Sequence, residues 1–164
     1  MSNILKLSDR CKVIRDGDIV YKQLFKYSDI NLFETILDEY MEFCNLYPKA
    51  EFIEVLDYKD GIITIPYYDV PIFGRVKSKI TQRSLLEYSK QLNTTLQCLL
   101  DYSINKNKMY IHNDLTPYNA LWLSSDKFKW IDPESFTSNN TFKYSLMANF
   151  HNHVAVLIDQ CSNV

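Results

Sequence analysis

Two short polar runs constrain the fold of this chain more than any other feature of its sequence. The first, from His112 to Asn119, reads His-Asn-Asp-Leu-Thr-Pro-Tyr-Asn, and the second, around Asp132, reads Trp-Ile-Asp-Pro-Glu. Asp132 follows Asn119 by thirteen residues, a spacing that suits a loop, a strand and a return to the same place. We therefore expect a fold that brings Asp114, Asn119 and Asp132 to one site.

The chain is long enough for one compact domain or for two small lobes that share an interface. It has 164 residues, of which 46% are hydrophobic and 14% are aromatic. A chain with this many apolar residues buries a core, which excludes a disordered tail protein. The 18 basic residues are balanced by 20 acidic ones without a dense basic block, which argues against nucleic acid as the main partner.

Neither secretion nor a membrane span is expected from the sequence. The N-terminus has no apolar leader, and no uncharged apolar run approaches the roughly 18 residues of a spanning helix. The four cysteines, Cys11, Cys44, Cys98 and Cys161, form no closely spaced pair, so we expect buried reduced thiols and a cytoplasmic protein. With three glycines in all, neither G-x-G-x-x-G nor a P-loop is present.

The first 68 residues follow a strand pattern interrupted by one helix. Short β-favouring runs predict strands over residues 4–7, 12–15, 19–24, 52–58 and 62–68, and turns at Gly17 and Gly61 join two pairs of them. Apolar residues from Phe33 to Tyr47 recur at helical spacing until Pro48 ends the run. This pattern predicts an antiparallel sheet with one helix.

The remainder of the chain is expected to be mainly helical. Pro66, Pro71 and Gly74 mark a linker, so that residues 1–68 and 69–164 form two lobes of one domain. Ser84 and Glu87 resemble a capping box early in a long helix that ends near residues 105–108. Short strands over 109–112 and 127–132 and a final helix over 142–158 complete the prediction.

The run from His112 to Asn119 is similar to the catalytic loop of the protein-kinase-like superfamily, whose pattern is His-x-Asp-Leu-x-x-x-Asn. Asp132 then stands in the place of the metal-binding Asp-Phe-Gly, and the Ile-Asp-Pro-Glu wording most resembles the aminoglycoside phosphotransferase and choline-kinase branch. The resemblance implies a two-lobed α+β fold. Its N-lobe would be a five-stranded antiparallel sheet with one helix, and its C-lobe would be truncated and mainly helical.

The resemblance also implies a role for each residue of the two runs. Phosphoryl transfer needs an aligned nucleophile and a neutralised phosphate charge, usually with Mg²⁺ held by hard oxygen ligands. Asp114 would accept the proton of the attacking hydroxyl, Asn119 and Asp132 would bind Mg²⁺, and His112 would brace the catalytic loop. Any one of these residues alone could cap a turn or a helix, but their joint spacing favours the catalytic reading.

Two further residues are implied upstream: a strand lysine that contacts the phosphates of ATP, and a helix glutamate that pairs with it. Lys22 fits the first, although an exposed strand lysine is the plain alternative. Glu34, Glu39 and Glu42 are candidates for the second. Glu39 lies seventeen residues after Lys22 and nine before Pro48, which resembles the family spacing best, and any of the three could instead be solvated helix charge.

Residues 63–68 fall where such kinases bind adenine through the backbone. Pro66 has no N–H, so Tyr67 or Tyr68 would have to donate a backbone hydrogen bond to adenine.

The sequence also departs from the family pattern. It has no glycine-rich loop in the first hairpin and no Ala-Pro-Glu after Asp132. Glu134 replaces the glycine of the metal motif, either as an additional ligand near the metal or as a hydrogen-bond acceptor within the loop.

These features together predict an ATP- and Mg²⁺-dependent phosphotransferase. Its acceptor would be a hydroxyl of a small molecule such as a sugar, an amino sugar or an amino alcohol. Two alternatives are a minimal atypical protein kinase and a catalytically silent nucleotide-binding module. Because only 32 residues follow Asp132, we expect an acceptor side that is either open or completed by a partner, such as a second copy of the chain.

Overall fold

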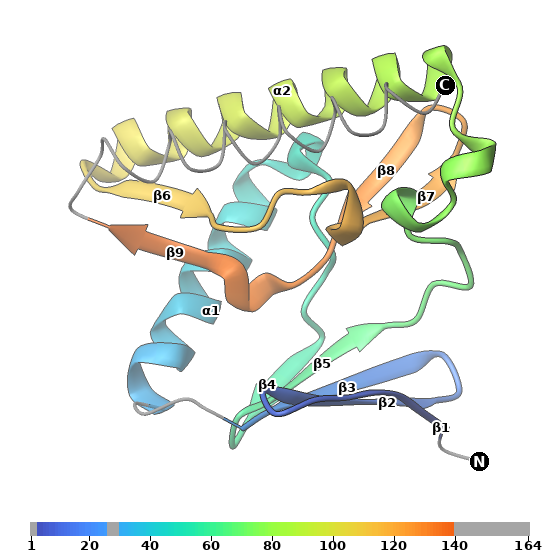
Figure 1. Cartoon of the computed structure of the whole chain (residues 1–164). Coiled ribbons are helices and arrows are strands. Elements are labelled where there is room, and N and C mark those ends of the chain that lie inside the picture. The colour runs from blue at the N-terminus through green and yellow to red at the C-terminus, as the bar shows by residue number, and fades with distance from the viewer. Residues whose placement is uncertain (1–2, 26–29, 140–164) are drawn as a thin grey trace.

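The computed structural model describes residues 3–25 and 30–139 of the chain, and it begins with a five-stranded sheet and one helix (Figure 1). All neighbouring strands are antiparallel, in the order β1-β2-β3-β5-β4. This confirms the predicted sheet and helix. The elements are β1 (Asn3–Leu7), β2 (Cys11–Asp16), β3 (Ile19–Leu24), α1 (Ile30–Leu46), β4 (Asp57–Lys59) and β5 (Ile62–Pro66).

The second part of the chain places two small antiparallel ladders beside one long helix. In Figure 1, α2 lies along the top, the five-stranded sheet lies at the bottom, and both ladders lie between them. β6 (Met109–His112) pairs with β9 (Phe136–Asn139), and β7 (Ala120–Ser124) pairs with β8 (Lys127–Trp130). The other elements are α2 (Gln82–Lys106) and the one-turn 3₁₀ helices η1 (Pro48–Ala50), η2 (Phe73–Arg75), η3 (Lys77–Lys79), η4 (Pro117–Asn119) and η5 (Pro133–Ser135).

The turn between β4 and β5 shows why glycine is required there. Asp60 and Gly61 both have positive φ values, 52° and 76°. Two successive residues in this region form the tight hairpin turn that matches the twist of the flanking strands, and Asp-Gly is a favoured pair for it. The turn therefore sets the register Lys59 opposite Ile62.

Helix α1 is attached to both parts of the molecule through one apolar stripe. Phe33, Leu37, Tyr40 and Phe43 recur every three or four residues, and each is at most 1% exposed. The Tyr40 and Phe43 rings lie 5.6 Å and 5.5 Å from that of Phe136 in β9. Because the same helix face contacts elements on both sides, α1 holds the sheet and the β6–β9 ladder in one core.

Helix α2 begins one turn earlier than the sequence predicts. Its N-cap is Thr81, whose hydroxyl accepts the Ser84 N–H at 3.2 Å, while the Ser84 hydroxyl accepts the Thr81 N–H at 2.9 Å. Ser84 thus occupies the N3 position of a capping box whose N-cap is Thr81, and the predicted box of Ser84 with Glu87 is wrong. The helix ends at Lys106, and Asn107 follows with a left-handed φ of 50°, which confirms the predicted end.

The predicted strand over residues 52–58 is mostly wrong. Ile53 N–H donates to the Trp130 carbonyl and Trp130 N–H donates to the Glu51 carbonyl, each at 2.8 Å. The start of this segment therefore runs beside β8, and only its end joins the five-stranded sheet, where β4 has three residues. Its extended pattern was read correctly, but a sequence pattern does not say which strand supplies the hydrogen bonds.

Other predictions differ in extent or lie outside the described residues. The predicted strand over 127–132 ends at Trp130, and β9 was not foreseen. Cys11, Cys44 and Cys98 are free thiols. Cys161 and the predicted helix over 142–158 fall outside residues 3–25 and 30–139. Within those residues, none of the helices combines the length and the apolar character that crossing a membrane requires.

Candidate active site

Lys22 of β3 meets the second polar run of the sequence. Its ammonium donates to Asp132 Oδ1 at 2.6 Å and forms an ion pair with Glu134 Oε1. Burial by itself would lower the pKa of Lys22, but the charges of Glu134 and Asp132 outweigh it and raise the pKa. Lys22 is therefore a buried cation held by two carboxylates, 7% exposed as a whole residue.

The backbone at Asp132 explains how both carboxylates reach the same lysine. β8 ends at Trp130, and Asp132 has φ 66° and ψ 62°, in the left-handed region. Asp tolerates this conformation better than most residues, and such backbone strain concentrates at functional sites. The chain then turns through η5, where the Ser135 N–H donates to the Asp132 carbonyl at 2.9 Å. This turn presents Asp132 and Glu134 to Lys22.

His112 connects the two polar runs. It is fully buried, its Nε2 lies 3.0 Å from the carbonyl oxygen of Asp132, and its Nδ1 lies 3.3 Å from the backbone nitrogen of Asp114. Burial lowers the pKa of His112 to about 4. A neutral ring satisfies both contacts, with Nε2–H donating to Asp132 and Nδ1 accepting from Asp114. This geometry braces the loop.

Asp114 precedes η4, and Asn119 is the last residue of η4. The Asp114 carbonyl accepts hydrogen bonds from the Thr116 N–H at 2.9 Å and from the Asn119 side-chain amide at 3.1 Å. The Asn119 carbonyl accepts the Ile131 N–H at 3.0 Å, which places the end of the loop beside the residue before Asp132. Among the described residues nothing donates to the Asp114 carboxylate or to Asn119 Oδ1. These oxygens are thus available to a substrate or a metal.

The side-chain oxygens of Asn119 and Asp132 fit Mg²⁺ bound together with a nucleotide. In the described part of the chain, no three His, Cys, Asp or Glu side chains cluster as a metal site. Mg²⁺ does not need such a cluster, because it is commonly held by one or two carboxylates with substrate phosphates and water. The amide oxygen of Asn119 and the carboxylate of Asp132 are hard ligands of this kind.

Comparison with known proteins supports the fold. Neither a protein-family model nor a curated protein matches the chain. Among solved structures, the ADP-bound crystal structure of the aminoglycoside phosphotransferase APH(2'')-Ib superposes with a TM-score of 0.61. The match covers 85% of this chain and 67% of that one, at 12% sequence identity. This chain has a protein-kinase-like fold. At such low identity the likeness establishes the fold alone.

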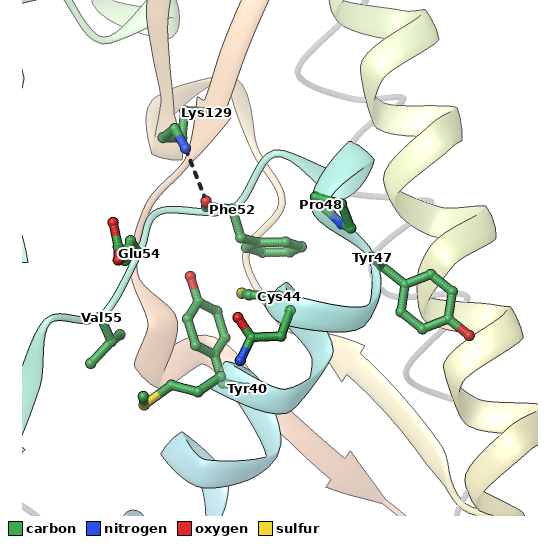
Figure 2. Close-up of a pocket in the computed structure, with 10 residues that line it drawn as sticks. Tyr40, Cys44, Tyr47, Pro48, Phe52, Glu54, Val55 and Lys129 are labelled. Carbon is green, nitrogen blue, oxygen red and sulfur yellow. Dashed lines mark hydrogen bonds between the residues drawn. The ribbon is translucent and has the colours of Figure 1, made fainter.

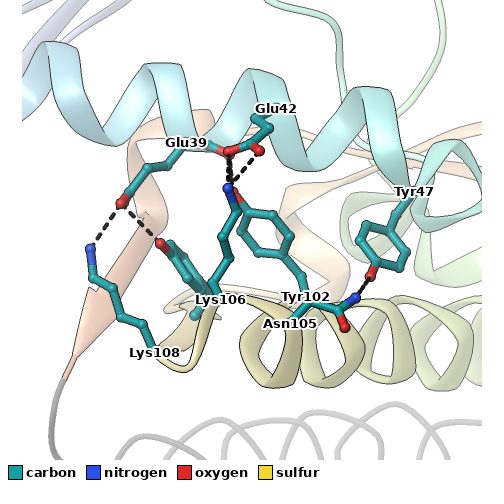
Figure 3. Close-up of polar contacts among 8 residues, drawn as sticks. Glu39, Glu42, Tyr47, Tyr102, Asn105, Lys106 and Lys108 are labelled. Carbon is teal, nitrogen blue, oxygen red and sulfur yellow. Dashed lines mark hydrogen bonds and ion pairs between the residues drawn. The ribbon is translucent and has the colours of Figure 1, made fainter.

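The kinase-like fold makes the position of Glu39 unexpected. Its Oε1 accepts hydrogen bonds from Lys108 Nζ at 2.8 Å and from the Tyr110 hydroxyl at 2.9 Å, and it does not contact Lys22 (Figure 3). Glu39 precedes the buried Tyr40 and is therefore turned about 100° away from it around α1. The predicted pairing of Glu39 with Lys22 is wrong in this structure, because Lys22 is paired with Asp132 and Glu134. Glu34 and Glu42, the other two candidates, do not pair with Lys22 either.

In the expected adenine-binding segment, the backbone N–H groups of Tyr67 and Tyr68 differ in whether they are already hydrogen-bonded. The Tyr67 N–H donates to the Asp18 carbonyl at 2.8 Å, and the Cζ atom of Arg15 lies 3.6 Å from the centre of the Tyr67 ring. Tyr67 is thus engaged at the end of the β2–β3 hairpin, and its predicted role as the backbone donor is wrong. The Tyr68 N–H makes no hydrogen bond to any described residue, so Tyr68 remains the predicted donor.

A separate cavity of about 270 Å³ lies between α1 and the segment that follows it (Figure 2). It contains none of the predicted site residues. Burial raises the pKa of the Cys44 thiol to about 12, so the cavity holds no reactive nucleophile. We therefore do not assign it to the kinase-like site. Its lining is Tyr40, Met41, Cys44, Asn45, Tyr47, Pro48, Phe52, Glu54, Val55 and Lys129.

Gly74 of η2 packs directly against the catalytic loop, and sequence reasoning placed it only in a linker. A methyl group at Gly74 would lie 2.9 Å from the Pro117 carbonyl carbon and from Tyr118 Cδ1. These contacts are too short, so only glycine allows this close approach. Gly74 therefore sets the position of η4.

Replacing Gly74 by Ala is expected to displace η4 and to lower the free energy of unfolding by about 1–3 kcal/mol, as overpacking does. Denaturant unfolding measures the loss. Arg75→Ala, at the exposed neighbouring position, is the control and is expected to stay within about 0.5 kcal/mol of the parent chain. An unchanged unfolding midpoint for Gly74→Ala would mean that the loop does not depend on this contact.

The burial of His112 makes stability depend on pH. The ordinary histidine pKa of about 6.5 applies to the unfolded chain, whereas the folded value is about 4. Between these values the unfolded chain binds a proton that the folded chain does not. The free energy of unfolding should therefore fall by about 3 kcal/mol as the pH drops from 7.5 to 4.

The pH dependence of denaturant midpoints tests this, with His112→Asn as the control. The raised pKa of Glu134, caused by its burial and by the charge of Asp132, acts in the opposite sense at low pH and is common to both proteins. The parent chain should lose more stability than His112→Asn between pH 7 and 5. Identical slopes would contradict the prediction.

Proposed function

We propose that this protein is a phosphotransferase that uses ATP and Mg²⁺ to phosphorylate a hydroxyl group of a small molecule, such as a sugar, an amino sugar or an amino alcohol. The observation that carries the proposal is the convergence of three segments on Asp132. Lys22 Nζ lies 2.6 Å from its carboxylate, and His112 Nε2 lies 3.0 Å from its carbonyl. Phosphoryl transfer depends on positioning and charge neutralisation, which such a convergence supplies.

In this proposal each residue has one task. Lys22 would contact the nucleotide phosphates, with the sheet and α1 in residues 1–68 as the nucleotide-binding lobe. Asn119 and Asp132 would hold Mg²⁺, which supplies charge neutralisation at the phosphates when bound. Asp114, whose carboxylate is exposed, would accept the proton of the acceptor hydroxyl. His112 would position the loop and would not transfer a proton to or from the substrate, since both of its ring nitrogens are engaged.

The small-molecule acceptor is supported by the name of the structural neighbour, an aminoglycoside phosphotransferase. A minimal protein kinase and a silent nucleotide-binding module are the alternatives that the experiment must separate. About a third of the neighbour's chain lies outside the match. We propose that a partner, such as a second copy of this chain, completes the acceptor side, and light scattering tests the second copy.

The test uses the full chain with ATP, Mg²⁺ and a panel of hydroxylated metabolites. Acceptor-dependent release of ADP that disappears with EDTA supports the proposal. Transfer of labelled phosphate to proteins of a lysate, without transfer to any metabolite, would favour a protein kinase. Thermal stabilisation by Mg²⁺ and ATP without any turnover would favour the silent module, because a ligand at 100 times its Kd adds about 2.7 kcal/mol of stability.

A further inference from the structure

The carboxylates near Lys22 and those of Glu39 and Glu42 on α1 belong to two separate sets of contacts. Lys22 is paired with Asp132 and Glu134, which lie on the turn after β8. The second set joins α1 to the end of α2 and to β6, and we name it the α1–α2 clamp. It consists of Glu39, Glu42, Tyr47, Tyr102, Asn105, Lys106, Lys108 and Tyr110 (Figure 3).

We propose that Glu134 is the positioning residue that holds Lys22 in the site, and that Glu39 and Glu42 of α1 do not contribute to this task because the clamp engages both of them elsewhere. The inference rests on the proposed function, since it concerns how the phosphate-binding lysine is placed. It assigns to a residue of the metal loop the role that the family resemblance gives to a helix glutamate.

The local geometry favours Glu134 as this partner. Its side chain is 17% exposed and that of Lys22 is 9% exposed, so the ion pair is largely shielded from water. A shielded ion pair is strongly coupled, and removing one partner leaves an uncompensated buried charge. Glu134 also lies in η5, within two residues of Asp132, so that one rigid turn places both carboxylates.

The buried face of α1, which packs toward η5, carries no carboxylate. α1 packs against η5 and β9, and its buried stripe consists of Phe33, Leu37, Tyr40 and Phe43. Tyr40 donates its hydroxyl to the Ile53 carbonyl at 2.5 Å, which fixes the rotation of the helix. A carboxylate of α1 would have to replace part of this stripe to face Lys22.

The clamp gives Glu39 and Glu42, two of the three glutamates of α1, other partners. Glu42 accepts hydrogen bonds from Lys106 Nζ at 2.6 and 2.8 Å and from the Tyr102 hydroxyl at 2.9 Å. The contact with Lys106 lowers the pKa of Glu42. Together with the contacts of Glu39 to Lys108 and Tyr110, these bonds attach α1 to both α2 and β6. To reach Lys22, Glu39 would have to give up two hydrogen bonds.

The inference has a functional consequence. If Lys22 is held by the metal loop, the site is assembled without a movement of α1. Any change that switches the site between competent and incompetent states must then act on the turn that contains Asp132 and Glu134. A nucleotide with Mg²⁺ would then act on this turn directly, because its phosphates and metal approach the same lysine and carboxylate.

Double-mutant cycles on the unfolding of the full chain test the pairing without any assay of activity. Lys22→Met combined with Glu134→Gln is expected to depart at least about threefold from the product of the single effects on the unfolding constant, as contacting residues do. Lys22→Met with Glu39→Gln should agree with the product within about twofold, as for independent sites. Glu39→Gln with Lys108→Met should again depart from it.

A second measurement covers a Lys22 variant that fails to fold. Amine modification of Lys22, followed by mass spectrometry, should be faster in Glu134→Gln than in the parent chain and unchanged in Glu39→Gln. The affinity for an ATP analogue with Mg²⁺, measured by thermal shift, should weaken at least about tenfold in Glu134→Gln, equivalent to 1.4 kcal/mol. Glu42→Gln, on the same helix, is the matched control and should bind like the parent.

The outcomes separate this inference from the proposed function. A parent chain that binds no nucleotide would refute the function, while the cycles and the modification rates would still decide which carboxylate holds Lys22. Coupling of Lys22 to Glu39 above threefold, with or without the nucleotide, would overturn the inference. Equal modification rates of Lys22 in Glu134→Gln and in the parent chain would overturn it as well.

Discussion

Asp114→Asn is expected to lower the phosphotransfer rate by about 10²–10⁴-fold, the usual contribution of a positioned general base. The carboxylate of Asp114 is exposed, and its hydrogen bonds within the loop are made by its backbone N–H and carbonyl. Asn keeps this backbone and nearly the same shape. The fold and the affinity for ATP should therefore persist while turnover of the acceptor is lost.

The measurement is the rate of ADP release with a saturating acceptor, together with thermal shift by ATP and Mg²⁺. Asp126→Asn is the matched control, since Asp126 is also exposed but lies in the turn between β7 and β8. It makes the same change in charge and should leave the rate unaltered. Undiminished turnover in Asp114→Asn would remove Asp114 from the catalytic role.

Trp130→Ala is expected to lower the free energy of unfolding by about 3–5 kcal/mol, the range for large aromatic residues in a core. Trp130 is fully buried, and its indole N–H donates to the Thr95 hydroxyl of α2 at 2.8 Å. It also precedes Asp132 by two residues. The substitution should therefore loosen the turn that presents Asp132 to Lys22, and denaturant unfolding followed by circular dichroism measures the effect.

The second tryptophan provides the control. Trp122 is partly exposed, and its indole nitrogen is buried without a hydrogen-bond partner among residues 3–25 and 30–139. Trp130→Phe should cost about 1–3 kcal/mol because a buried hydrogen bond is broken, whereas Trp122→Phe breaks no hydrogen bond of the indole to the described residues and should cost less. Equal losses at the two positions would contradict this account of Trp130.

The elements whose pattern is local in the sequence agree best with the structure. The strands β1, β2 and β3 and the helices α1 and α2 were foreseen, because the period of their apolar residues and their turns depends on neighbours along the chain. The predicted N-cap of α2, Ser84, lies three residues after the observed one, because Thr81 is the N-cap and Ser84 occupies the N3 position of its capping box. The segment 52–58 divides between two partners, with its start bonded to β8 and its end bonded to β5.

The catalytic loop and the metal loop could be read from sequence because their residues are close along the chain. Asp114, Asn119 and Asp132 lie within one loop–hairpin–turn unit, whose local geometry is set by residues such as Pro117 and Pro133. The sequence by itself therefore determined which groups this unit presents: a carboxylate, an amide and a second carboxylate in a fixed order.

Only the tertiary structure decided which carboxylate holds Lys22. Lys22 and Asp132 are 110 positions apart, and Lys22 could pair with any acidic residue that the fold brings near. The rotation of α1, set by its buried aromatic stripe, turns Glu39 toward Lys108, while the left-handed turn at Asp132 brings Glu134 to Lys22. Charge attracts without specifying a partner, so the packing of the core makes this choice.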